Sequence, residues 1–124
     1  PLRRPHAVEE TGPGDDGHAK YRAKTPAAGA YRLWALSNWY DGCGNSFFLY
    51  VDDKPAVVIG QDGTYQHWHW VKGPRLQLAE GWHWIRFQNR EDGAKLDQFM
   101  LTTSSRYVPV RKETPTPQYI AKPE

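Results

Sequence analysis

The chain has 124 residues and a formal net charge of +2, and 14% of its residues are aromatic. A chain of this length forms one domain at most, and so small a charge disfavours a nucleic-acid partner. The single cysteine, Cys43, excludes an internal disulfide. No apolar run approaches the roughly 20 residues of a membrane-spanning helix. We therefore predict no transmembrane segment, and a chain that begins at Pro1 without a signal peptide is expected to be processed or incomplete.

The chain divides into a central region and two polar ends. Residues 1–18 are rich in Pro, Gly, Asp and Glu, and are predicted to form an extended N-terminal arm. Residues 109–124 are predicted to form a second, Pro-rich arm at the C-terminus. The central region, 19–108, has no helical periodicity, and turn-forming residues separate its β-type segments. The predicted strands are 19–24, 29–37, 46–52, 56–59, 66–71, 75–78, 82–88 and 96–102. Eight short strands favour an all-β antiparallel β-sandwich, or jelly roll.

Three of these segments carry large apolar side chains on both faces. Successive residues of a strand point to opposite sides, so Trp34 faces away from Leu33, and Phe48 away from Phe47. Besides Tyr50, the aromatic residues on the second faces are Trp34, Phe48, Trp82 and Trp84. A free-standing sandwich usually has polar residues at such positions. We predict that these four rings are covered by a ligand, by the arms of the chain, or by a neighbouring protein at an interface.

Four motifs occur together in the order AGAYRLW (28–34), GNSFFLYVD (44–52), GWHWIRF (81–87) and REDGAKLDQFMLT (90–102). In this order they resemble the galactose-binding-like β-sandwich, and more closely the non-catalytic carbohydrate-binding modules of families 6 and 35. The resemblance covers about residues 18–108. It implies a secreted, sugar-binding domain without catalytic activity. The chain departs from the family in two ways. Its N-terminal region is short, which implies a short, displaced or absent opening strand. It also has Trp82 and Trp84 where family members usually have polar residues.

The resemblance also implies a site for a sugar at the tip of the sandwich. The loop 38–45 offers an aromatic platform together with amide and carboxylate groups, which are the groups that bind pyranose rings and their hydroxyls. The predicted glycan-binding residues are Asn38, Trp39, Tyr40, Asp41 and Asn45, joined by Glu91 and Asp92 from a neighbouring loop. The alternative is a structural turn in which Trp39 packs inward.

A structural calcium ion is a further expectation from the resemblance. Such modules often hold the ion between a glutamate of the first strand and an aspartate of the last, which here would be Glu10 (or Glu9) and Asp97. The alternative for Asp97 is a strand-end residue that accepts hydrogen bonds from nearby backbone. A site built on the two imidazoles of His67 and His69 is disfavoured, because no acidic ligand stands at a matching spacing.

The sequence predicts no enzyme, because no nucleophile has a base beside it and a small sandwich offers little room for two opposed carboxylates. Two functions stay open. The first is a carbohydrate-binding module, extracellular or periplasmic, that holds a glycan through the tip loop and exposed aromatics. The alternative is a structural subunit of a larger extracellular or membrane-associated assembly, in which the arms and aromatic faces pack on neighbouring chains. The expected partners are therefore a glycan, other protein subunits, or both.

Overall fold

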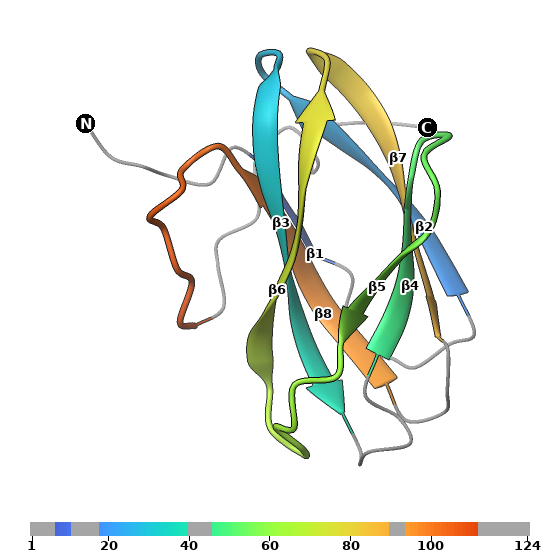
Figure 1. The fold of residues 1–124 in the computed structure, drawn as a ribbon, viewed down its shortest axis with the longest axis vertical. Helices are drawn as coiled ribbons and strands as arrows, with labels where there is room; N and C mark the ends of the chain where they lie inside the picture. Colours follow the sequence, from blue (N-terminus) through green and yellow to red (C-terminus); the bar gives the residue numbers. More distant parts are fainter. Residues whose placement is uncertain (1–6, 11–17, 40–45, 90–93, 112–124) are drawn as a thin grey trace.

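Two four-stranded antiparallel sheets pack face to face in the computed structural model, which describes residues 7–10, 18–39, 46–89 and 94–111 (Figure 1). The strands are β1 (Ala7–Glu10), β2 (His18–Thr25), β3 (Gly29–Trp39), β4 (Ser46–Val51), β5 (Val57–Gly60), β6 (His69–Leu78), β7 (Gly81–Asn89) and β8 (Ala94–Thr102). The first sheet has the order β1-β8-β3-β6, and the second has the order β2-β7-β4-β5. The described residues contain no helix long and apolar enough to cross a membrane. The predicted all-β antiparallel sandwich is confirmed.

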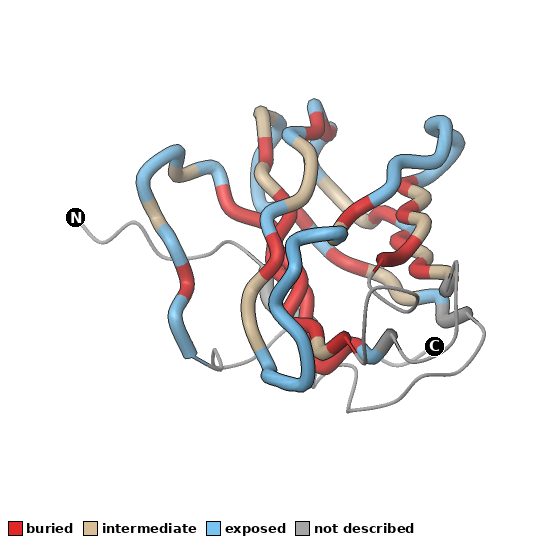
Figure 2. The backbone as a smooth tube through the Cα atoms, turned by 60° about the horizontal axis from the view of Figure 1, so that its bottom comes forward, coloured by how far each residue is buried: buried red, intermediate tan, exposed pale blue. Residues whose placement is uncertain are grey.

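The core lies between the two sheets and follows the alternation of the strands. Every second residue of β3 from Tyr31 to Trp39 is fully buried, and Leu33 and Ala35 belong to the same cluster. The second sheet contributes the alternate residues Phe47, Leu49, Val51, Ile85 and Phe87. Figure 2 shows the buried positions concentrated in the strands, whereas the connections between them are largely exposed. The period-2 pattern of the sequence therefore identifies the core face of the central strands.

The N-terminal region contains a strand that the sequence did not predict. Residues 7–10, assigned to the extended arm 1–18, form β1 and pair antiparallel with β8, from Ala7 opposite Leu101 to Glu10 opposite Gln98. Four residues are too few to show a clear alternation, so only the partner strand reveals this one. Of the three alternatives for the opening strand (short, displaced or absent), the structure shows a short one, and β1 covers one edge of β8.

Strand β6 joins two segments that were predicted as separate strands, 66–71 and 75–78. The Gly73-Pro74 pair between them is typical of a turn, but it forms a bulge here, because Arg32 pairs with Arg75 while Trp34 pairs with Lys72. Proline is tolerated because β6 is the edge strand of its sheet. Arg32 Nη1 donates a hydrogen bond to the carbonyl of Gly73 at 2.8 Å and holds the bulge in place.

Part of the outer face of the first sheet, around Trp34, is covered by the chain itself. Trp34 is only 8% exposed and forms a small cluster with Met100, against which Trp70 and Tyr107 pack. Trp70 Nε1 donates a hydrogen bond to the carbonyl of Arg111 at 2.9 Å, so the segment after β8 returns to β6. Trp34, predicted to be an interface residue, is therefore covered within the chain, by Trp70 and Tyr107 of the central region. The C-terminal arm takes part only through the Arg111 carbonyl that binds Trp70.

Candidate functional site

The predicted tip site lies mostly outside the described residues. Tyr40, Asp41 and Asn45, and likewise Glu91 and Asp92, fall in the ranges 40–45 and 90–93 that the structure does not describe. Asn38 is half-buried near the end of β3. Their role in glycan binding stays a prediction, with the exception of Trp39.

Trp39 is part of the core, and its prediction as a sugar-stacking ring is wrong. Its side chain is fully buried, and the ring packs against Phe47 at 5.3 Å and His69 at 6.0 Å between centroids. The indole Nε1 donates a hydrogen bond to Asp62 Oδ1 at 3.0 Å, while Asp62 Oδ2 lies 2.7 Å from His69 Nε2. Trp39 continues the core-facing alternation of β3, so both faces of its ring are unavailable to a sugar.

A different surface collects exposed aromatic and charged side chains, namely the outward face of the second sheet. The register pairs Lys20 with Arg86, Arg22 with Trp84 and Lys24 with Trp82 across β2 and β7. On the other side of β7, Tyr50 and Phe48 of β4 lie opposite Arg86 and Gln88. All these residues occupy the strand positions that alternate with the core, so they share one face. We call this surface the β2-β7-β4 face.

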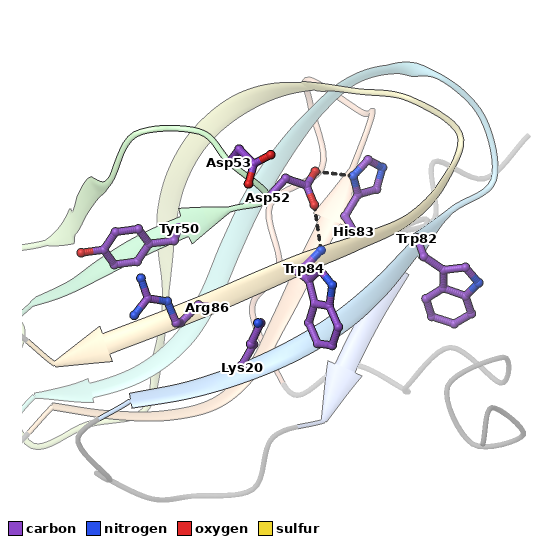
Figure 3. Close-up of a pocket in the computed structure, with 8 residues that line it drawn as sticks. All are labelled: Lys20, Tyr50, Asp52, Asp53, Trp82, His83, Trp84 and Arg86. Carbon is purple, nitrogen blue, oxygen red and sulfur yellow. Dashed lines mark hydrogen bonds and ion pairs between the residues drawn. The ribbon is translucent and has the colours of Figure 1, made fainter. Parts of the chain in front are cut away.

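The cations of this face lie over its aromatic rings. Lys20 Nζ is 4.4 Å from the centroid of the Trp84 ring (Figure 3). Arg22 Cζ is 5.4 Å from the same centroid. Arg86 Cζ is 3.9 Å from the centroid of Tyr50. At the far end, Arg22 and Lys24 approach the Trp82 ring at 4.9 and 5.8 Å. Each such contact is worth about 0.5–1 kcal/mol at an exposed site and restricts the motion of a long basic side chain.

An aspartate fixes one end of the face. Asp52 Oδ2 lies 2.7 Å from His83 Nδ1, and Asp52 Oδ1 accepts a hydrogen bond from the backbone N–H of Trp84 at 2.9 Å. The second ring nitrogen of His83, Nε2, lies 2.7 Å from the carbonyl of Ala79. Both ring nitrogens thus lie within hydrogen-bond distance of an oxygen, one just after the end of β4 and one in the turn before β7. His83 is buried and connects β7 to the residue that follows β4.

The face is hollowed into a cavity of about 770 Å³, which is the size of a ligand site. Its lining residues are Lys20, Tyr50, Asp52, Asp53, Trp82, His83, Trp84 and Arg86. Trp84 is 46% exposed, whereas Phe48 and Trp82 are half-buried. The sequence analysis identified Trp82 and Trp84 but missed the basic residues beside them. The signal was present in the alternation of Lys20, Arg22 and Lys24 along a predicted strand.

The structure describes part of the predicted calcium site. Asp97 is buried, and it is the extra residue of a bulge in β8, since Leu36 pairs with Gln98 and Ser37 with Leu96. The pairing of β1 with β8 brings the backbone of Glu10 opposite Gln98, next to Asp97. Among the described residues there is no group of three His, Cys, Asp or Glu side chains that could hold a metal. His67 and His69 accordingly form no metal site there, and His69 binds Asp62 instead.

The sequence comparison found one curated relative and no matching family model. The relative is the "Uncharacterized protein P23" of Formosa agariphila, which is 27% identical over 129 residues. The match takes in 81% of this chain but 28% of the relative. The chain therefore spans less than a third of the length of that relative.

The structural comparison found carbohydrate-binding modules and modular enzymes. The mannanase "GH26-CBM35" of Podospora anserina superposes with a TM-score of 0.65 at 14% identity, over 82% of this chain and 28% of that one. A family 35 module from Clostridium thermocellum superposes with a TM-score of 0.56 at 16% identity, over 78% of this chain and 87% of the module. The module CBM6cm-2 of Cellvibrio mixtus lichenase 5A was solved with cellotriose. It superposes with a TM-score of 0.55 at 16% identity, over 82% of this chain and 90% of the module. The chain thus has the β-sandwich fold of family 6 and 35 modules, as the resemblance implied.

Proposed function

We propose that this domain binds a polysaccharide without acting on it, and that the chain lies across the β2-β7-β4 face. The observation that carries the proposal is the 770 Å³ hollow on that face, with the exposed Trp84 ring in its wall. Its fold, shared with modules such as the cellotriose-bound CBM6cm-2, supports a carbohydrate ligand at the level of fold. The tip-loop residues that lie outside the described ranges stay a second predicted contact.

The shape and chemistry of the face support a polymer rather than a small ligand. The hollow lies on a sheet surface, and its lining residues come from β2, β7, the end of β4 and the turn after it. A flat surface with aromatic rings and polar side chains suits a chain of sugars, each of which offers an apolar ring face and several hydroxyls. The two functions of the side chains are then distinct. The rings supply contact area, and the charged groups orient the polymer.

Replacing Trp84 with alanine should weaken polysaccharide binding about five- to thirty-fold, which corresponds to a loss of about 1–2 kcal/mol. The reason is that the ring is the most exposed aromatic group in the hollow and also positions Lys20. Native affinity electrophoresis against a panel of neutral and charged polysaccharides measures the change. Trp68→Ala is the matched control, because Trp68 is 42% exposed but is not among the lining residues. Equal retardation of wild type and Trp84→Ala on every bound polysaccharide would remove the face from the site.

We propose a non-enzymatic role outside the cytoplasm, extracellular or periplasmic. The support is the fold, which is shared with modules that stand as separate domains, such as the family 35 module of Clostridium thermocellum.

Calcium binding by Asp97 and Glu10 is a separate proposal, supported by the β1–β8 pairing and by the burial of Asp97 in a bulge. An ion held only by the folded chain stabilises that state by mass action. Excess chelator should therefore lower the melting temperature, and added calcium should restore it. Asp97→Asn should melt at a temperature that calcium does not change. A wild-type melt that is the same with chelator and with calcium would reject the ion and leave Asp97 a structural residue.

The assembly role has one supporting observation of its own. The edge strand β5 exposes Val57 and Val58, and an apolar hollow of about 280 Å³ lies beside it. An open edge with apolar side chains is a surface on which another domain or subunit can pack. If copies of this chain assemble there, analytical ultracentrifugation should show a concentration-dependent oligomer that Val58→Asp dissociates and that Val110→Asp, at another exposed valine, leaves intact. A monomer at all concentrations would reject contact between copies.

A further inference from the structure

We infer that the β2-β7-β4 face selects an anionic polysaccharide, one that carries sulfate or carboxylate groups along its chain. This inference rests on the proposed function, because it names the class of polymer that the same site takes. Three observations support it. They are the row of basic residues on β2, the position of basic groups over aromatic rings, and the balance between basic residues and carboxylates on the face.

The first observation is a line of positive charge. Lys20, Arg22 and Lys24 occupy alternate positions of β2, so their Cα atoms follow one another at about 6.8 Å along one face. Arg86 stands beside Lys20 in the register of β7. A regular row of cations matches a polymer whose charges repeat along its length. A neutral glycan can accept hydrogen bonds from these groups, but only an anionic one also gains the attraction between opposite charges.

The second observation is the position of the cations over the rings. Lys20 and Arg22 both lie over Trp84, and Arg86 lies over Tyr50 at 3.9 Å. The basic groups cover only part of these rings, since Trp84 stays 46% exposed and can still contact a sugar. The contact with the ring holds the basic side chain in one orientation, which lowers the entropy lost when an anion binds. The rings therefore serve in part as supports for the charges.

The third observation concerns charge balance. The face carries Lys20, Arg22, Lys24 and Arg86, whereas the hollow is lined by two carboxylates, Asp52 and Asp53. Asp52 follows the end of β4, and its carboxylate is engaged by His83 and by the backbone N–H of Trp84, both on β7. Within the described ranges, neither Lys20 nor Arg86 forms an ion pair with a carboxylate. The charges of Lys20 and Arg86 are thus held by aromatic rings and by the Gln88 amide, which are neutral groups.

A matched set of polymers tests the inference. Dextran and dextran sulfate share one backbone and differ in charge, polygalacturonate carries carboxylates in place of sulfates, and polyglutamate is a polyanion without sugars. We expect binding to dextran sulfate, to polygalacturonate or to both, with little binding to dextran or polyglutamate. Preference between the two anionic glycans identifies whether sulfate or carboxylate is the group recognised. Binding should weaken as sodium chloride is raised, because exposed charges are screened over about 10 Å at 0.1 M salt.

The variants separate the charge from the surface. Lys20→Gln/Arg86→Gln should lower affinity for the anionic glycan about tenfold, the effect of losing two exposed charge contacts. Lys72→Gln/Arg75→Gln removes the same charge from exposed positions of β6 in the other sheet, and should leave affinity unchanged. Thermal melts of both double variants establish that the fold is retained, and a tenfold loss with an intact fold supports the inference.

The failure of the inference is distinguishable from the failure of the proposed function. If dextran or another neutral polysaccharide binds as tightly as its charged counterpart, and Trp84→Ala weakens that binding, the function stands and the anionic preference is overturned. Equal binding of polyglutamate and the anionic glycans, or an unchanged affinity in Lys20→Gln/Arg86→Gln, also overturns the preference. If no polysaccharide of any charge binds, the proposed function itself is rejected.

Discussion

Trp39→Ala should lower the free energy of unfolding by about 3–5 kcal/mol, the usual cost of removing a large aromatic side chain from a core. Trp39 is fully buried, contacts Phe47 and His69, and donates a hydrogen bond to Asp62. Its loss leaves a cavity and also takes away one partner of Asp62, whose Oδ1 additionally accepts the backbone N–H of Thr64. Urea denaturation followed by circular dichroism measures the change.

Trp84→Ala is the matched control for this experiment, because it removes the same side chain from an exposed position. It should change the free energy of unfolding by about 1 kcal/mol or less, chiefly through the loss of its cation–π contacts. The two tryptophans should thus separate stability from binding. A Trp39→Ala protein as stable as Trp84→Ala would show that Trp39 is not buried in solution, and its predicted role in sugar stacking would return.

Gly73→Ala should lower the free energy of unfolding by about 1–3 kcal/mol, the range typical of overpacked positions. A Cβ atom at residue 73 would stand 2.8 Å from the backbone carbonyl oxygen of Leu33 and 3.1 Å from its side chain. The oxygen cannot move aside easily, because Leu33 is fully buried and pairs with Leu101 of β8. We expect the bulge opposite Leu33 to open, and a lower urea midpoint would report it.

Gly29→Ala is the control for this prediction. Its Cβ would meet only Thr103 Cγ2, at 3.9 Å, which is an ordinary van der Waals contact. Replacing a glycine where alanine fits without strain is neutral or stabilises by about 0.4–1 kcal/mol through the unfolded chain. If Gly73→Ala and Gly29→Ala were equally stable, the prediction that β6 packs too closely on Leu33 to admit a Cβ atom would be rejected.

The alternation of core-facing and outward-facing residues in the sequence predicted most of the fold. It predicted the central strands, the core faces of β3, β4 and β7, and the all-β sandwich. It also placed Trp82 and Trp84 on the side opposite the core, where the β2-β7-β4 face lies. These predictions rest on the two-residue period of a β-strand. That period can be recognised in a segment of five or six residues without knowledge of the rest of the fold. The row of Lys20, Arg22 and Lys24 was readable in the same way.

Which of the outward rings are covered depends on contacts between distant residues. Trp34 and Trp84 have the same local pattern, yet Trp34 is buried because Trp70 and Tyr107 pack over it. The bond from Trp70 to Arg111 spans 41 residues, and the bond from Trp39 to Asp62 spans 23. Strand β1 likewise exists only through its pairing with β8, more than 80 residues further along the chain. Local alternation assigns a side chain to one face of a strand, but only packing between segments far apart in the sequence covers that face or leaves it open to a ligand.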